Sequence, residues 1–174
     1  MAGRINILGH PVHPILIVFP LGLLPSAVGC DIVYLVRNNP NWAHMSYWLI
    51  AAGVVSGVVA AFFGFMDWWG LPAGTRARRI GVWHLLANDG LLIFFAASWW
   101  LRRPMPDHPS AAAIALGVIG LVCGVFGGWL GGELVYRLNV SVDAGAHLNS
   151  PSSLSSRPAS DYAETLPASE RERG

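Results

Sequence analysis

Four long apolar runs, separated by short polar connections, dominate the pattern of the chain. They cover roughly residues 12–36, 45–67, 81–101 and 110–136. A transmembrane helix needs on the order of 20 mostly apolar residues, and each run reaches that length. Because the connections are short and rich in turn-forming residues, successive helices must run antiparallel. The pattern predicts an all-α fold, a polytopic membrane protein built as a four-transmembrane-helix antiparallel bundle.

The composition supports the same class of protein. Hydrophobic residues make up 53% of the 174 positions, charged residues only 12%, and the mean hydropathy is +0.47. These values are typical of an integral membrane protein whose main partner is the lipid bilayer. A net charge of +1 gives no indication of nucleic-acid binding. From residue 148 the chain is rich in Ser, Pro, Ala, Glu and Arg, so we expect a bundle over 1–147 and a disordered tail over 148–174.

The basic residues predict an orientation in the membrane. All of them are arginines, and almost all lie in the connections between the apolar runs. One end of the predicted bundle collects Arg4, Arg76, Arg78, Arg79 and Arg137, and the other collects Arg37, Arg102 and Arg103. Because positively charged connections stay on the cytoplasmic side, both termini should be cytoplasmic, in the inner (cell) membrane.

Most of the ionisable side chains near the span ends fall at the same end of the predicted bundle. Ionisable groups at membrane depth are costly and are usually kept for pairing or for function. Asn88 shares a helix face with His84, four positions earlier. We therefore predict that one layer of the bundle holds a candidate site, made of His10, His13, Asp67, His84, Asn88, Glu133 and Arg137.

The stretch "GHPVHP" sets two histidines, each followed by a proline, at the start of the first run. A residue before proline is pushed toward extended geometry. In a polyproline II segment, which repeats every three residues, His10 and His13 would project from one side, about 9 Å apart. The alternative is that both histidines only cap the first span and bond to nearby loops.

Two further patterns have ordinary structural interpretations. Glu133 and Arg137 are four residues apart in the order that favours an ion pair within one helix. Asp31 is expected to pair with Arg37 or with a neighbouring helix. Glycines at 120, 124, 128 and 132 predict close helix packing, or alternatively a slot for a flat cofactor.

With these residues in view, the chain resembles a bacterial and archaeal family of four-span membrane proteins, domain of unknown function 2231. The resemblance covers roughly residues 8 to 143 and rests on "GHPVHPILIVFPLGLL", "GFMDWWGLPAGTRARR" followed by "WHLLAND", and "GGWLGGELVYRLNVSV". Leu138 and Asn139 stand where that family commonly has histidine and glycine. The resemblance implies the fold and the importance of His10, His13, Asp67, His84, Gly131, Gly132, Glu133 and Arg137. Some members are joined to Rieske-type iron–sulfur domains, which implies electron transfer with other redox proteins.

Two classes of function follow from the residues. In the first, the layer binds a cofactor for membrane electron transfer. A b-type haem would take His84 and either His10 or His13 as axial ligands, with Asn88 beside them and an arginine, Arg76, Arg78 or Arg137, on the propionates. A divalent metal ion would instead use His10, His13, Asp67, His84 and Glu133.

In the second class, the chain binds no cofactor. It is a membrane scaffold or accessory subunit, and the polar layer is a structural hydrogen-bond network. The sequence has no nucleophile elbow, no H-E-x-x-H motif and no phosphate-binding loop, so it gives no sign of an enzyme acting on its own.

Overall fold

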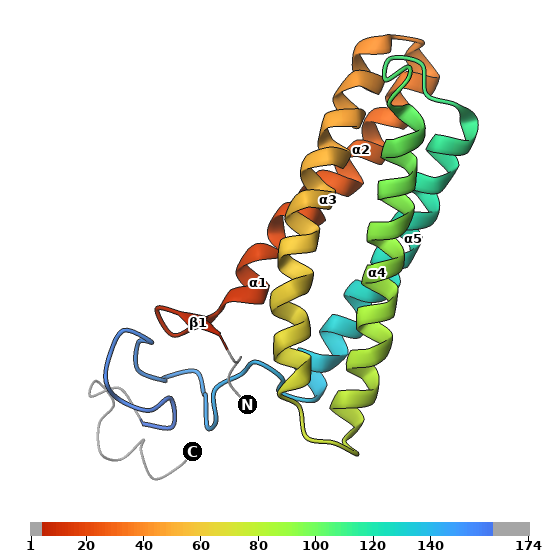
Figure 1. Cartoon of the computed structure of the whole chain (residues 1–174). Helices are drawn as coiled ribbons and strands as arrows, with labels where there is room; N and C mark the ends of the chain where they lie inside the picture. The colour runs from red at the N-terminus through yellow and green to blue at the C-terminus, as the bar shows by residue number, and fades with distance from the viewer. Residues whose placement is uncertain (1–4, 162–174) are drawn as a thin grey trace.

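The computed structural model describes residues 5–161 and consists mainly of long helices that stand side by side (Figure 1). The helices are α1 (Val12–Leu16), α2 (Val18–Arg37), α3 (Pro40–Trp69), α4 (Arg76–Arg102), α5 (Ala111–Gly132) and the π-helix η1 (Glu133–Arg137). Four segments are long and apolar enough to cross a membrane: Val12–Arg37, Pro40–Trp69, Arg76–Arg102 and Ala111–Arg137. The prediction of an all-α, four-span fold is confirmed, and the chain is a multi-pass membrane protein.

The helix boundaries follow from local chemistry. The side chains of Asn39, Thr75 and Ser110 each accept a hydrogen bond from a backbone N–H in the first turn of α3, α4 and α5. These contacts satisfy donors that have no partner within the helix. At the other end of α2, Asn38 adopts a left-handed conformation with φ of 49°, a common way to stop a helix.

The first span is interrupted between α1 and α2, at Ile17. Pro20 has no N–H to donate to the carbonyl of Leu16, four residues earlier, and its ring crowds that carbonyl. The break therefore falls where proline removes a helical hydrogen bond. In Figure 1, α1 continues from α2 toward the N-terminal hairpin, and it packs on α3.

The bundle is two helical hairpins packed together. The first pairs α2 with α3, the second pairs α4 with α5, and α3 lies against α4. Between them lies a core centred on Leu24, Ala27, Val28, Ile50 and Phe95. The connections α2–α3 and α4–α5 lie at one end of the bundle, and the α3–α4 connection and the N-terminal hairpin lie at the other (Figure 1).

A small hairpin precedes the first span. Strand β1 (Asn6–Ile7) pairs antiparallel with β2 (His10–Pro11), and Leu8 and Gly9 form the turn with φ of 51° and 80°. Residues 138–161 form turns and irregular backbone, in which Ser153 packs against Gly9. The predicted disordered tail covers residues 148–174, and its last part, 162–174, lies outside the described residues.

Candidate functional site

His13 and His84 lie next to each other at the end of the bundle that carries the N-terminal hairpin and the α3–α4 connection. His13 belongs to α1 and His84 to α4, and their ring centres are 6.4 Å apart with planes at 88°. The Nδ1–H of His13 donates to the carbonyl of Ala60 on α3 at 2.8 Å. The Nδ1–H of His84 donates to the carbonyl of Gly127 on α5 at 2.9 Å. In each ring Nδ1 is thereby used by a carbonyl, and Nε2 is the nitrogen suited to a ligand; in His84 the amide of Asn88 also lies 3.4 Å from Nε2.

Glycines on α3 and α5 make room for these two rings. Gly64, four residues after the acceptor Ala60, lies under His13, where an added Cβ would come within 2.8 Å of the ring. Gly131, four residues after the acceptor Gly127, lies under His84, where a Cβ would come within 3.1 Å. Only glycine allows an imidazole to lie this close to the neighbouring helix backbone.

Asn88 makes further contacts around His84. Its Nδ2 donates to the backbone carbonyl of His84 at 2.7 Å and lies 3.4 Å from both ring nitrogens of that residue. A Cβ on Gly127 would come within 2.9 Å of this amide. The predicted pairing of His84 with Asn88 on one helix face therefore describes a real contact.

The charged residues at this end make contacts that the sequence did not predict. Glu133 accepts a hydrogen bond from Arg76, on the first turn of α4, at 2.9 Å. The expected intrahelical pair of Glu133 with Arg137 is wrong, because η1 is a π-helix and its geometry changes the four-residue spacing. Arg137 is exposed and has no ion pair within residues 5–161, and Asp67 is partly buried near the end of α3.

His10 lies apart from the histidine pair. It is exposed on β2, and its Nε2 lies 3.3 Å from the hydroxyl of Ser153. The expected polyproline II segment is also wrong, because α1 begins at Val12 and makes His13 helical. Pro14 sits in the first turn, where a missing N–H costs nothing, and the bond from His13 to Ala60 holds the turn in place.

The glycine pattern on α5 is in a different phase from the one expected. The positions that receive side chains from α4 are Gly120, Gly124, Gly127 and Gly131, whereas nothing lies within 4 Å of a Cβ on Gly128. Phe95 and Leu91 lie over Gly120 and Gly124. Over Gly120 and Gly124 the stripe is therefore a helix-packing surface filled by α4.

The opposite end of the bundle holds a buried ion pair that sequence reasoning missed. The guanidinium of Arg102 donates two hydrogen bonds of 2.7 Å to the carboxylate of Asp31, and both residues are at most 1% exposed. Ser46 and Ser98 bond to the same guanidinium, and Ser98 also donates to the carbonyl of Ala113. This network ties α2, α3, α4 and α5 together. Of the two partners expected for Asp31, Arg37 or a neighbouring helix, the structure shows the neighbouring helix.

An internal repeat relates the two helical hairpins. On the leading helices, matched residues are 71 positions apart: His13 and His84, Leu24 and Phe95, and Asp31 and Arg102. On the following helices, matched residues are 67 positions apart: Gly53 and Gly120, Gly57 and Gly124, Ala60 and Gly127, and Gly64 and Gly131.

The contacts repeat along with the residues. A Cβ on Gly53 would come within 2.5 Å of Leu24, and one on Gly120 within 2.8 Å of Phe95. Since the two hairpins also run in the same direction, they are related by an approximate two-fold axis along the membrane normal, as in parallel repeats of other membrane proteins. His13 meets His84 near this axis at one end, and Asp31 meets Arg102 near it at the other.

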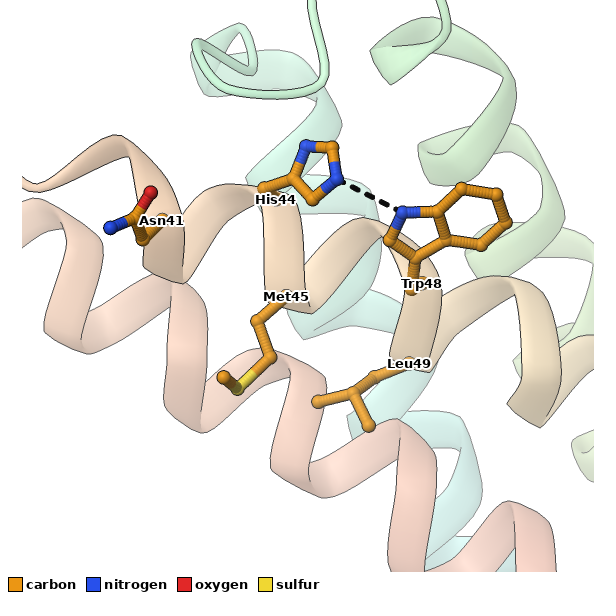
Figure 2. A pocket seen from close by; sticks show the side chains of 5 residues that line it. All are labelled: Asn41, His44, Met45, Trp48 and Leu49. Atoms are coloured by element: carbon orange, nitrogen blue, oxygen red, sulfur yellow. Dashed lines mark hydrogen bonds between the residues drawn. The ribbon is translucent and has the colours of Figure 1, made fainter.

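A shallow hollow lies at the end of the bundle away from the histidine pair. It has a volume of about 450 Å³ and is lined by Asn41, His44, Met45, Trp48 and Leu49 of α3 (Figure 2). His44 bonds to Asp107 at 2.7 Å and accepts from the indole of Trp48 at 3.0 Å. Both nitrogens of His44 are therefore engaged, and the hollow offers no free imidazole.

The proposed five-residue metal set is not assembled in the described chain. Within residues 5–161, no three His, Cys, Asp or Glu side chains form a group that could hold a metal ion. What the structure brings together from the predicted layer is His13, His84 and Asn88, with Glu133 held by Arg76.

Comparison with known proteins places the fold in a family of membrane proteins. No curated protein and no solved structure matches the chain. A family described as a predicted membrane protein, DUF2231, matches residues 9–144, which include all four spans. The chain therefore belongs to the DUF2231 family of predicted membrane proteins.

Proposed function

We propose that this protein binds one b-type haem through His13 and His84 and serves as an electron-transfer component of the membrane. The observation that carries the proposal is the pair itself: two imidazoles from different helices, each with Nδ1 bonded to a backbone carbonyl, with ring centres 6.4 Å apart. A histidine that binds a metal through Nε2 commonly donates its Nδ1–H to such a carbonyl, which fixes its orientation.

The surroundings of the two rings bear on which group they could hold. Two imidazoles at corners of a tetrahedral metal site would have ring centres about 5 Å apart, closer than the 6.4 Å between His13 and His84. Within residues 5–161, no third His, Cys, Asp or Glu joins them to complete a set for a bare metal ion. The pair therefore supports a haem, which His13 and His84 would hold and which would supply one-electron chemistry.

The other residues at this end have supporting roles in the proposal. Gly64 and Gly131 let the rings approach the helix backbones, and the carbonyls of Ala60 and Gly127 set the ring orientation. Arg137 is the candidate partner for a propionate, because Arg76 is engaged by Glu133 and Arg78 bonds to the carbonyl of Leu71. A bound haem supplies one-electron chemistry, and a membrane redox protein would be the exchange partner.

The test is to purify the full chain from haem-replete cells, record oxidised and reduced spectra, and assay metals on the same sample. We expect a Soret band that is lost in His13→Ala and His84→Ala and kept in His10→Ala and His44→Ala. His44 is the matched control, since it is a histidine in the same fold with both ring nitrogens bonded elsewhere. A colourless protein with a stoichiometric metal would favour the metal site, and one with neither would favour the scaffold role.

We also propose that the histidine pair lies toward the cytoplasmic side, with both termini cytoplasmic. The support is the arginine bias: Arg76, Arg78, Arg79 and Arg137 lie at the same end as the pair, against Arg37, Arg102 and Arg103. Of the second group, Arg102 is buried in an ion pair, which leaves fewer free charges at that end. Reporter fusions at Arg79 and Arg103 should lie on opposite sides, and an external reporter at Arg79 reverses the orientation.

A further inference from the structure

One face of α4 forms an exposed seam that no helix of the described chain covers. Its residues follow an alternating four- and three-residue spacing: Val82, Leu86, Asp89, Ile93, Ala96 and Trp100. Leu86, Ile93 and Trp100 are exposed by 55%, 65% and 63%. This spacing is the one by which two helices pack along each other as a coiled coil.

The seam lies opposite the face that α4 uses to pack on α5. The packed face carries His84, Asn88, Leu91 and Phe95, all of which lie over glycines of α5. Each of these follows a seam residue by two positions, which is a little more than half a turn of an α-helix. The seam is therefore a separate surface, directed away from the bundle.

Asp89 interrupts this apolar seam at the middle of the membrane. It is the central residue of α4 (Arg76–Arg102), thirteen residues from either end, so it lies about 20 Å from each end of the helix. It is exposed, and within residues 5–161 it has neither a hydrogen bond nor an ion pair. An ionisable group at this depth requires a polar partner, because lipid supplies none.

The basic residues of the chain lie away from that depth. The chain contains no lysine, and the arginines of its spans lie at helix ends, at 37, 76, 78, 79, 102 and 137. A second copy of the chain, related by a two-fold axis along the membrane normal, places its own Asp89 at the same depth. Two protonated carboxyl groups can each donate a hydrogen bond to the other, which leaves no charge in the lipid.

We propose that α4 is the interface of a parallel homodimer, in which the two Asp89 carboxyls are both protonated and hydrogen-bond to each other across the two-fold axis. A single polar residue in an apolar seam is a known way to fix the register and the number of helices. The apolar residues on either side of Asp89 supply the packing, and the carboxyl pair sets the alignment. This interface is independent of the histidine pair, which faces the interior of the bundle.

Cysteine cross-linking of the full chain in native membranes tests the interface. In a Cys30→Ala, Cys123→Ala background, we expect Leu86→Cys and Ile93→Cys to form disulfide-linked dimers on mild oxidation. Val122→Cys on α5 is the matched control, because Val122 is 64% exposed and Ile93 is 65% exposed. Chains that stay monomeric at 86 and 93, or that cross-link equally at 122, overturn the proposal.

A charge swap tests the role of Asp89 itself. We expect Asp89→Lys to abolish the Ile93→Cys cross-link by repulsion, and co-expression with a chain that keeps Asp89 to restore it as a mixed dimer. If the lysine variant does not fold, Asp89→Leu provides the second test, with self-association in vesicles weakened roughly three- to thirty-fold. Unchanged association in Asp89→Leu, or capture of a different protein with a basic residue at mid-membrane by a monomeric chain, contradicts the proposal.

Discussion

The two helical hairpins pack in the same way, but the matched residues that meet at the axis between them are of different types at the two ends of the bundle. At one end the matched residues differ: Asp31 in the first hairpin meets Arg102 in the second. At the other end they are identical: His13 meets His84. Identical charged groups facing each other across an axis repel, so the buried pair is stable only because its members have opposite charge. Imidazoles carry no fixed charge, and in the proposed site His13 and His84 would hold one ligand between them.

The leading helices of the two halves also differ. The first is broken at Ile17, and a short separate helix, α1, carries His13. The second is continuous, and Asn88 occupies the position that matches Ile17. The second half therefore holds its histidine with an extra amide contact, whereas the first holds its histidine at a helix start where proline loosens the backbone.

The largest effect is expected at the buried ion pair. Arg102→Leu leaves Asp31 charged and unpaired in the interior, and we predict a loss of about 3–5 kcal/mol in the free energy of unfolding. Asp31→Leu combined with Arg102→Leu should recover most of this loss, since no charge is left alone. Unfolding in mixed micelles measures the change, with the exposed Arg103→Leu as control. Equal stability of Arg102→Leu and Arg103→Leu would show that the pair does not hold the hairpins together.

A smaller effect is expected at the glycines under the two rings. Gly64→Ala places a Cβ within 2.8 Å of the rigid ring of His13, and we predict a cost of about 1–3 kcal/mol together with loss of cofactor absorbance. Gly131→Ala, at 3.1 Å from His84, should cost less. Gly128→Ala has open space and serves as the control. The same loss at Gly64 and Gly128 would mean that the approach of His13 to α3 is unimportant.

The smallest effect is expected at Asn88. Asn88→Leu makes the second half resemble the first at this position and removes the bond to the carbonyl of His84. Polar contacts between or within membrane helices contribute about 0.6 kcal/mol on average, so we predict a loss of that order. Ile17→Leu, at the matching position, is the control and should be neutral. A loss of several kcal/mol on Asn88→Leu would show that the Asn88 amide, rather than the imidazole pair, is the main stabilising group at this end of the bundle.

The fold was predictable because span length and hydropathy alone determine it. The grouping of His13, His84 and Asn88 at one end also followed from an antiparallel bundle. The α5 glycines that contact α4 were not predicted correctly. A spacing of four residues predicts contacts at Gly128 and Gly132, whereas the packed positions alternate four- and three-residue steps and include Gly127 and Gly131. The π-helix at Glu133 shifted an expected ion pair for a similar reason.

The burial of Arg102 was the main residue-level surprise. Its place beside Arg103 and Pro104 at a span end indicated a solvated connection, and only the packing of four helices shows that it lies inside. The signal that could have found it was in the sequence: glycines at 53, 57 and 64 recur at 120, 124 and 131. Superposing the two halves on that repeat aligns His13 with His84 and Asp31 with Arg102.

The electron paramagnetic resonance spectrum of the oxidised, purified protein tests the ligation of one haem by His13 and His84 most directly. A haem held by the two imidazoles would give a low-spin ferric signal. We predict this low-spin ferric signal in the native chain and in His44→Ala, and its loss in His84→Ala. A native protein without any low-spin ferric signal would contradict the account.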